Sequence, residues 1–167
     1  KIFRKYGQRS IAVVRANPLC NQHGIDTISA GACIAFAMHL YEKGILTRKK
    51  AGMDLSWGDK DAIVKLINMI IHQEKIGKLL SKGVKQMAEE LGADPEEAAH
   101  VKGLEFPMHD PRAYQGAALA YAVGPRGACH LKGAFYSLDA IMRTAWRMRW
   151  RFSTSARPLR SKIAPRV

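Results

Sequence analysis

Cysteine is scarce in this 167-residue chain, and its three cysteines, Cys20, Cys33 and Cys129, lie far apart. None of them belongs to a Cys-x-x-Cys pair, which is the usual start of a zinc or iron–sulfur ligand set. An odd number of widely spaced cysteines also argues against a disulfide-stapled secreted fold. The sequence therefore predicts no metal ligands of its own, and we expect a reducing, cytoplasmic compartment.

Long apolar runs are also missing. The longest uncharged stretch covers residues 27–41 and includes His39, whereas a membrane-spanning helix needs about 20 apolar residues. Residues 1–10 are basic but carry no apolar segment of the kind found in a secretory signal. We expect no membrane association.

Acidic side chains are absent from both ends of the chain. Residues 1–18 carry five basic side chains, the residues after Asp139 carry eight, and the formal net charge is +13. The other 14 basic residues match the 14 acidic ones, so the middle is formally neutral. Because a neutral middle is poorly suited to contacting phosphates, nucleic acid is not an expected partner. A small basic helical protein that binds nucleic acid or another anionic surface through its ends is the alternative function.

Strand-like alternation does not occur before residue 100, whereas helical spacing and helix caps do. Gly24 is placed to end a first helix in which Pro18 is an interruption or a kink, and Asp26 or Thr27 is placed to begin the next. Asp59 and Gly92 are a second start and stop. The sequence predicts a mainly α fold, with helices at residues 10–23, 28–43, 61–75, 79–83, 84–91 and 116–123.

Three regions differ in composition. Residues 1–100 are expected to form a helical domain, in which residues 47–58 are a polar loop and the helix over 61–75 is apolar nearly all round. Residues 101–140 are expected to start a second helical domain after an extended segment. Residues 141–167 form a basic tail that we expect to be poorly ordered.

A first candidate site is the motif Asn21-x-x-Gly24-Ile25-Asp26 between two predicted helices. A glycine turn before a helix presents free backbone N–H groups that suit an anion. A carboxylate there can accept paired N–H donors from a flat heterocycle. From spacing alone, the simpler interpretation is that Asp26 only caps a helix and Asn21 only ends one.

A second candidate is Arg126-Gly127-x-Cys129-His130, which is followed by Lys132. A histidine in a glycine turn can act as a general acid or base near neutral pH. A partly buried histidine bonded to a backbone carbonyl is the simpler alternative. Nearby, Asp110 and Arg112 flank a proline and are expected to lock a turn through a salt bridge.

Five blocks of the sequence, in order, resemble the tungsten-containing aldehyde ferredoxin oxidoreductases. They are LCNQHGIDTISAGACIAFAMHLYEKGILT, LSWGDKDAI, IGKLLSKGVKQMAEELG, HVKGLEFPMHDPRA and ALAYAVGPRGACHL. The likeness runs over residues 17–138, and several blocks in a fixed order are more specific than one short motif. It favours a functional interpretation of the first motif.

This resemblance implies an enzyme that oxidises aldehydes to carboxylic acids. The family holds tungsten through the dithiolenes of two pterins, beside a [4Fe–4S] cluster that passes electrons to ferredoxin. Two mostly helical domains close over this cofactor, and a β-rich domain forms its base.

The resemblance also assigns roles to residues. Asn21, Gly24, Ile25 and Asp26 match the family's first pterin-binding motif, in which Ile25 replaces the usual leucine. His130 matches the position near tungsten and substrate that assists proton transfer, which makes it the expected catalytic residue, and Lys132 is expected near the pterin.

Several family parts have no match in this chain. These are the upstream cysteine cluster, the second pterin motif with the fourth cysteine ligand, the catalytic glutamate before the first motif, and the β-rich base. We therefore expect a fragment of the helical part, inactive alone and completed by the remaining domains of the enzyme or by another copy of the chain.

Overall fold

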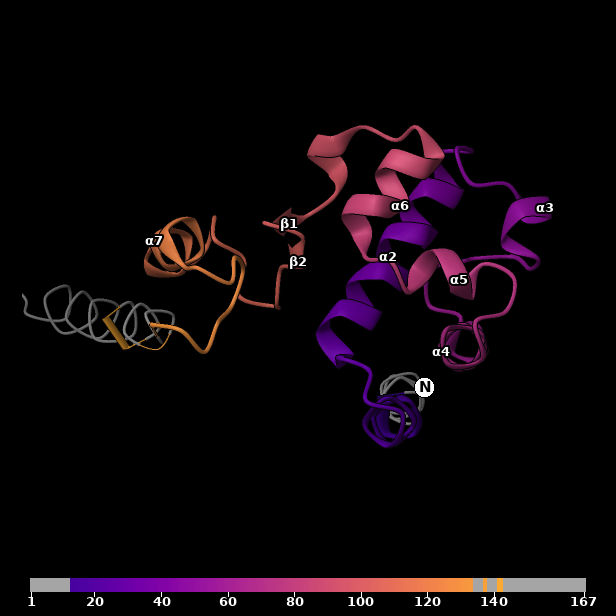
Figure 1. The fold of residues 1–167 in the computed structure, drawn as a ribbon, viewed down its shortest axis with the longest axis horizontal. Helices are drawn as coiled ribbons and strands as arrows, with labels where there is room; N and C mark the ends of the chain where they lie inside the picture. The colour runs from indigo at the N-terminus through magenta and orange to yellow at the C-terminus, as the bar shows by residue number, and fades with distance from the viewer. Residues whose placement is uncertain (1–12, 134–136, 138–140, 143–167) are drawn as a thin grey trace, which may run out of the picture.

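The computed structural model describes residues 13–133, together with residues 137, 141 and 142. The start of the first predicted helix and nearly all of the basic tail lie outside this range. In order, the described elements are a helical segment over residues 13–22, α2 (Thr27–Glu42), α3 (Arg48–Ala51), α4 (Lys60–His72), α5 (Gly77–Leu80), α6 (Val84–Leu91), a short 3₁₀ helix η1 (Pro95–Glu97), β1 (His100–Val101), β2 (Leu104–Glu105) and α7 (Gln115–Val123). The predicted mainly α fold is confirmed (Figure 1).

The predicted helix ends are confirmed where a local cap marks them. Asp26 Oδ1 accepts the backbone N–H of Ser29 at 2.8 Å at the start of α2. Asp59 caps α4 in the same way. Gly92 ends α6 in the left-handed region at a φ of 64°.

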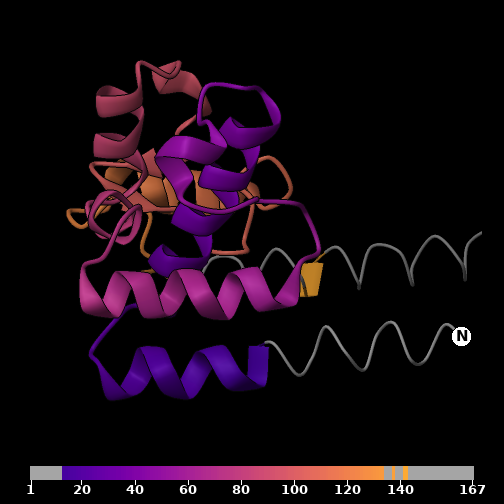
Figure 2. The ribbon, with the colours of Figure 1, turned by 90° about the vertical axis from the view of Figure 1, so that its right-hand side faces the viewer.

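Two local predictions are wrong. The segment over residues 47–58 is not all loop, because the Thr47 side chain caps the one-turn helix α3. Helix α4 is not buried all round: only the four residues on one of its faces are buried, Ala62, Leu66, Ile67 and Ile70. This helix packs mainly against α5 and α2, with the helical segment over residues 13–22 beside it (Figure 2). Its polar residues Asp61, Lys65 and His72 are exposed.

The main core surrounds α2, the longest of the described helices. Seven residues of α2 are buried, and their partners come from the other helices and the connecting segments between residues 20 and 98. A second, smaller core joins Ala117, Tyr121 and Ala128, with Val101 and Phe106 packed against it. The hairpin β1–β2 lies between the α2–α6 bundle and α7 (Figure 1).

The hairpin is the only strand pair in the part of the chain that the structure describes. It is antiparallel and pairs His100 with Glu105 and Val101 with Leu104. The sequence predicts that residues 100–113 are extended; residues 100–105 form this hairpin, whereas residues 111–113 form a turn. The proposed division into domains at residue 100 stays a prediction. Of the described helices, none is both long enough and apolar enough to cross a membrane.

Candidate functional site

The Asn21–Asp26 motif forms a tight link between two helices. The backbone N–H of Ile25 donates to the Cys20 carbonyl at 2.9 Å, and that of Gly24 donates to the Asn21 carbonyl at 3.3 Å. Gly24 has a φ of 66°, which completes a Schellman-type helix end. Ile25 then packs against the core, the apolar contact that usually accompanies this motif. Local folding therefore accounts for Gly24 and Ile25.

The side chains of the two polar residues at the ends of the motif take no part in the backbone bonds that close this turn. Asn21 and Asp26 are exposed, and Asp26 uses one carboxylate oxygen for the Ser29 N–H. The N-terminus of the 16-residue helix α2 adds its positive dipole end at this point. The arrangement leaves an exposed carboxylate where an N–H donor from a ligand can reach it.

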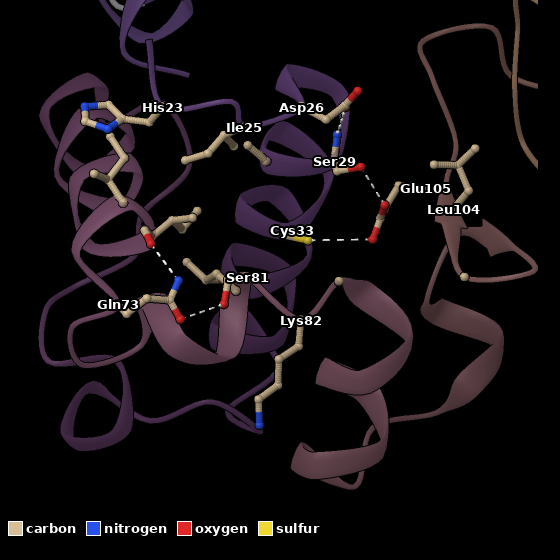
Figure 3. A pocket seen from close by; sticks show the side chains of 16 residues that line it. His23, Ile25, Asp26, Ser29, Cys33, Gln73, Ser81, Lys82, Leu104 and Glu105 are labelled. Atoms are coloured by element: carbon tan, nitrogen blue, oxygen red, sulfur yellow. Dashed lines mark hydrogen bonds between the residues drawn. The ribbon is translucent and has the colours of Figure 1, made fainter. Parts of the chain in front are cut away.

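A cavity of about 610 Å³ adjoins this link. Its polar lining comes from the link and α2, from the segment around α5, and from β2 (Figure 3). The polar side chains are His23, Asp26, Ser29, Gln73, Ser81, Lys82 and Glu105. A cavity of this size and polarity is sufficient for a fused heterocycle such as a pterin.

Glu105 is a site residue that the sequence did not indicate. It leaves only 4% of its surface exposed and lies between Leu104 and Phe106, at the end of the two-residue strand β2. Its carboxylate accepts from Ser29 Oγ at 2.7 Å and from the backbone N–H of Val84 at 3.0 Å. These donors come from residues far along the chain, so no local pattern reports them.

Cys33 adjoins the same carboxylate. Its Sγ lies 3.8 Å from Glu105 Oε1. Burial, together with the neighbouring Glu105 carboxylate, raises the pKa of the Cys33 thiol to about 12. Cys33 is therefore a protonated donor to Glu105 at neutral pH.

The second motif folds against the hairpin and α7. At Gly127 a side chain would meet the Val101 carbonyl at 2.0 Å, so only glycine permits this approach. His130 follows, half-buried, with its ring stacked on that of His109 at a centroid distance of 5.4 Å. Lys132 is exposed.

The turn before α7 is locked as predicted. Arg112 donates to both Asp110 oxygens, with Nη2 at 2.6 Å from Oδ2 and Nε at 3.0 Å from Oδ1. The Arg112 guanidinium holds the pKa of the Asp110 carboxyl at about 2. The pair is exposed, so it fixes a turn and adds little to stability.

The structure connects the two predicted motifs through the hairpin but does not bring them into one cavity. The cavity beside Asp26 is lined by β2 but not by His130 or Lys132. Val101 on β1 contacts Gly127, and Glu105 on β2 contacts Ser29. The hairpin thus has one motif on each side.

Metal ligands do not gather in the part of the chain that the structure describes. No group of three or more His, Cys, Asp or Glu side chains is placed to hold a metal ion there. Cys20, Cys33 and Cys129 are each free and buried. The described residues fit a pterin beside Asp26, and they do not fit an iron–sulfur cluster.

The comparison with known proteins assigns the chain to a family. A family model for aldehyde ferredoxin oxidoreductase, domains 2 and 3, matches residues 8–164. The chain belongs to the aldehyde ferredoxin oxidoreductase family. The resemblance seen in the sequence is confirmed, as is the mainly helical fragment that it implied.

Relatives within this family have named activities. The chain is 39% identical over 132 residues to a tungsten-containing aldehyde ferredoxin oxidoreductase of Thermococcus kodakarensis, and 38% identical to one of Pyrococcus furiosus. Each alignment covers 78% of this chain and 22% of the relative. An aliphatic sulfonate oxidoreductase, WOR-like subunit, of Pyrococcus furiosus is 35% identical over 129 residues, covering 73% of this chain and 21% of the relative. The chain thus spans about a fifth of the length of these relatives.

Proposed function

We propose that this chain is the helical part of a cytoplasmic enzyme that oxidises an aldehyde to a carboxylic acid at a tungsten–bispterin centre. Electrons pass through a [4Fe–4S] cluster to ferredoxin in the complete enzyme. The family match and the tungsten-containing relatives support this proposal. The remaining domains of the enzyme, or another copy of the chain, provide the rest of the site.

The observation that carries the proposal is the exposed Asp26 carboxylate at the start of α2, next to a polar cavity of about 610 Å³. Asp26 accepts N–H donors from the pterin edge, and Asn21 contributes a side-chain amide on the same link. Gly24 and Ile25 keep the link closed, so these two polar groups are presented together.

His130 and Lys132 serve the reacting end of the cofactor. The His130 imidazole has one ring nitrogen that can accept a proton and one that can donate, which suits proton transfer during aldehyde oxidation. Lys132 is exposed and places a cation where the negatively charged pterin phosphate or dithiolene can meet it. The tungsten–pterin group, when bound, accepts the electrons released by the substrate.

Cluster ligands come from elsewhere in the complete enzyme, because the described residues hold no suitable group. The isolated chain is therefore expected to bind pterin weakly and to show no aldehyde-dependent reduction of a viologen dye. Such activity from the isolated chain would contradict this assignment of the missing parts.

Two variants at Asp26 separate binding from helix capping. Asp26→Asn keeps a good cap but loses the charge, whereas Asp26→Ala loses both. We expect both variants to lose the binding of pterin-6-carboxylate, measured by amide shifts of residues 21–29 in NMR spectra. Only Asp26→Ala is expected to lower the free energy of unfolding, by about 1 kcal/mol. Unchanged pterin binding by Asp26→Asn, or no binding by the wild-type chain, would overturn the proposal.

A further inference from the structure

Glu105 is the only charged side chain among the described residues that is fully buried, with 4% of its surface exposed. A carboxylate taken out of water loses several kcal/mol of hydration, which only well-placed donors recover. Three donors reach it: the hydroxyl of Ser29, the backbone N–H of Val84 and the thiol of Cys33. No basic side chain is among these donors.

These three donors belong to two different helices. Ser29 and Cys33 lie on successive turns of α2, and Val84 is the first residue of α6. The start of α6 has no side-chain cap of its own, so the Glu105 carboxylate takes that place from a distant strand. Through one side chain, β2 is attached to the start of both helices.

Ser29 extends this connection to the pterin motif. Its hydroxyl donates to Glu105 Oε2 at 2.7 Å, while its backbone N–H donates to Asp26 Oδ1 at 2.8 Å. In Figure 3 the three side chains form one line from β2 to the link that precedes α2. Ser29 thus links Asp26 to a residue 79 positions further along the chain.

The other strand of the hairpin extends the connection toward His130. The Val101 carbonyl on β1 lies so close to Gly127 that a Cβ at this position would be 2.0 Å from its oxygen. Gly127 is three residues before His130. Lys102, in the hairpin turn, donates from Nζ to the Gly124 carbonyl at 3.0 Å. The hairpin is thus bonded to α2 on one side and to the segment after α7 on the other.

We propose that Glu105 is a positioning residue, whose buried carboxylate fixes the Asp26 turn relative to the hairpin that bears the His130 segment. The inference rests on the proposed function, because it gives Asp26 and His130 a reason to keep a constant separation. An apolar residue of similar size would bury at lower cost. A carboxylate instead supplies directional bonds to three separate partners.

The experiment uses the 167-residue chain with Glu105→Gln, Ser29→Ala and Ser29→Thr. Glutamine keeps the shape but loses the charge, alanine removes only the Ser29 bond, and threonine restores the hydroxyl. Glu97→Gln is the matched control, because it removes a carboxylate bonded to Lys43 at the opposite end of α2. Residual dipolar couplings of α2 and α7 amides report their relative orientation, and a pterin-6-carboxylate titration reports affinity.

We expect Glu105→Gln and Ser29→Ala to change the orientation of α7 relative to α2 and to weaken pterin-6-carboxylate binding about tenfold, the factor that corresponds to about 1.4 kcal/mol. Ser29→Thr and Glu97→Gln should match the wild type. Wild-type couplings and affinity in Ser29→Ala, or failure of Ser29→Thr to restore them, would overturn the proposal, even if Glu105→Gln does not fold. A wild-type chain that binds no pterin contradicts the proposed function alone, since the couplings still decide the role of Glu105.

Discussion

His130 stacks on His109, with the two imidazole planes inclined by 27° and the ring centroids 5.4 Å apart. His109 is itself held by Tyr114, whose ring meets it edge-on at 5.9 Å, and by Tyr121, whose hydroxyl donates to the His109 carbonyl at 3.1 Å. The expected catalytic histidine is therefore oriented by the segment before α7 and by α7 itself.

Replacing His109 with alanine should release the His130 ring. We expect the ring protons of His130 to move toward their values in an unfolded peptide, because the shielding by the stacked ring is lost. The free energy of unfolding should fall by about 1 kcal/mol, the usual size of an aromatic pair. Proton–carbon NMR spectra of the histidine rings measure the first effect, and thermal unfolding the second.

His72→Ala is the control for this prediction. His72 is exposed at the end of α4, remote in the fold from the α7 segment (Figure 1). Its removal should leave the His130 resonances unchanged. Identical His130 resonances in His109→Ala and in the wild type would contradict the stacked arrangement.

Features with a local cause could be predicted from the sequence. The caps at Asp26 and Asp59 and the stop at Gly92 each involve residues within four positions of one another, so the sequence order reports them directly. The Asp110–Arg112 pair is equally local. The composition of the helices indicated a mainly α fold for the same reason.

Features that join distant residues could not be predicted in this way. Glu105 is a charged residue, which is ordinarily exposed, and the two residues Ser29 and Val84 that bond to it in the interior lie far away in the sequence. The apolar composition of α4 wrongly predicted that the helix is buried on all sides. The number of helices packed around α4 decides how many of its faces are covered, and composition does not report that number. The composition of a helix shows which of its residues can be buried, and not how many of them are buried in the fold.

Gly83 should be less tolerant of alanine than Gly92, although both have a positive φ. At Gly83 a Cβ would lie 2.8 Å from Glu105 Oε1, whereas at Gly92 it would meet no atom within 4 Å. Gly92→Ala should lose about 1 kcal/mol because its backbone is left-handed, and Gly83→Ala should lose about 1–3 kcal/mol because a φ of 87° with a ψ of 161° is a region essentially restricted to glycine. Gly83→Ala should lose about 1–3 kcal/mol more, because it displaces the buried carboxylate from its donors.

Urea unfolding of the two variants measures this difference directly. Gly92→Ala serves as the reference for a glycine with positive φ that lacks the contact with Glu105. Equal losses in the two variants would show that Glu105 moves aside at no cost, which contradicts its place as a fixed acceptor for three donors.

Cys129 should react with iodoacetamide before Cys33 does. The backbone N–H groups of Leu131 and Lys132 lower the pKa of the Cys129 thiol, whereas burial and Glu105 raise that of Cys33 to about 12. The thiolate is the reactive form, so at pH 8 Cys129 carries the larger reactive fraction. Peptide mass spectrometry after timed labelling measures the order, and Cys129→Ser should remove the fast phase. Faster labelling of Cys33 than of Cys129 would contradict the opposite pKa shifts of the two thiols.

Cys33 should also make the folded chain less stable in alkali. Its pKa rises from 9.0 to about 12 on folding, so between these values the unfolded chain releases a proton that the folded chain retains. The contribution of the Cys33 thiol to the free energy of unfolding is fully present below about pH 9. It falls as the pH rises toward about 12, by up to about 1.4 kcal/mol for each pH unit. Other groups titrate in the same range, so the free energy of unfolding is compared between the wild type and Cys33→Ala from pH 8 to pH 11. The wild type should lose its advantage steadily over this range, and parallel curves for the two proteins would show that the thiol is not held protonated beside Glu105.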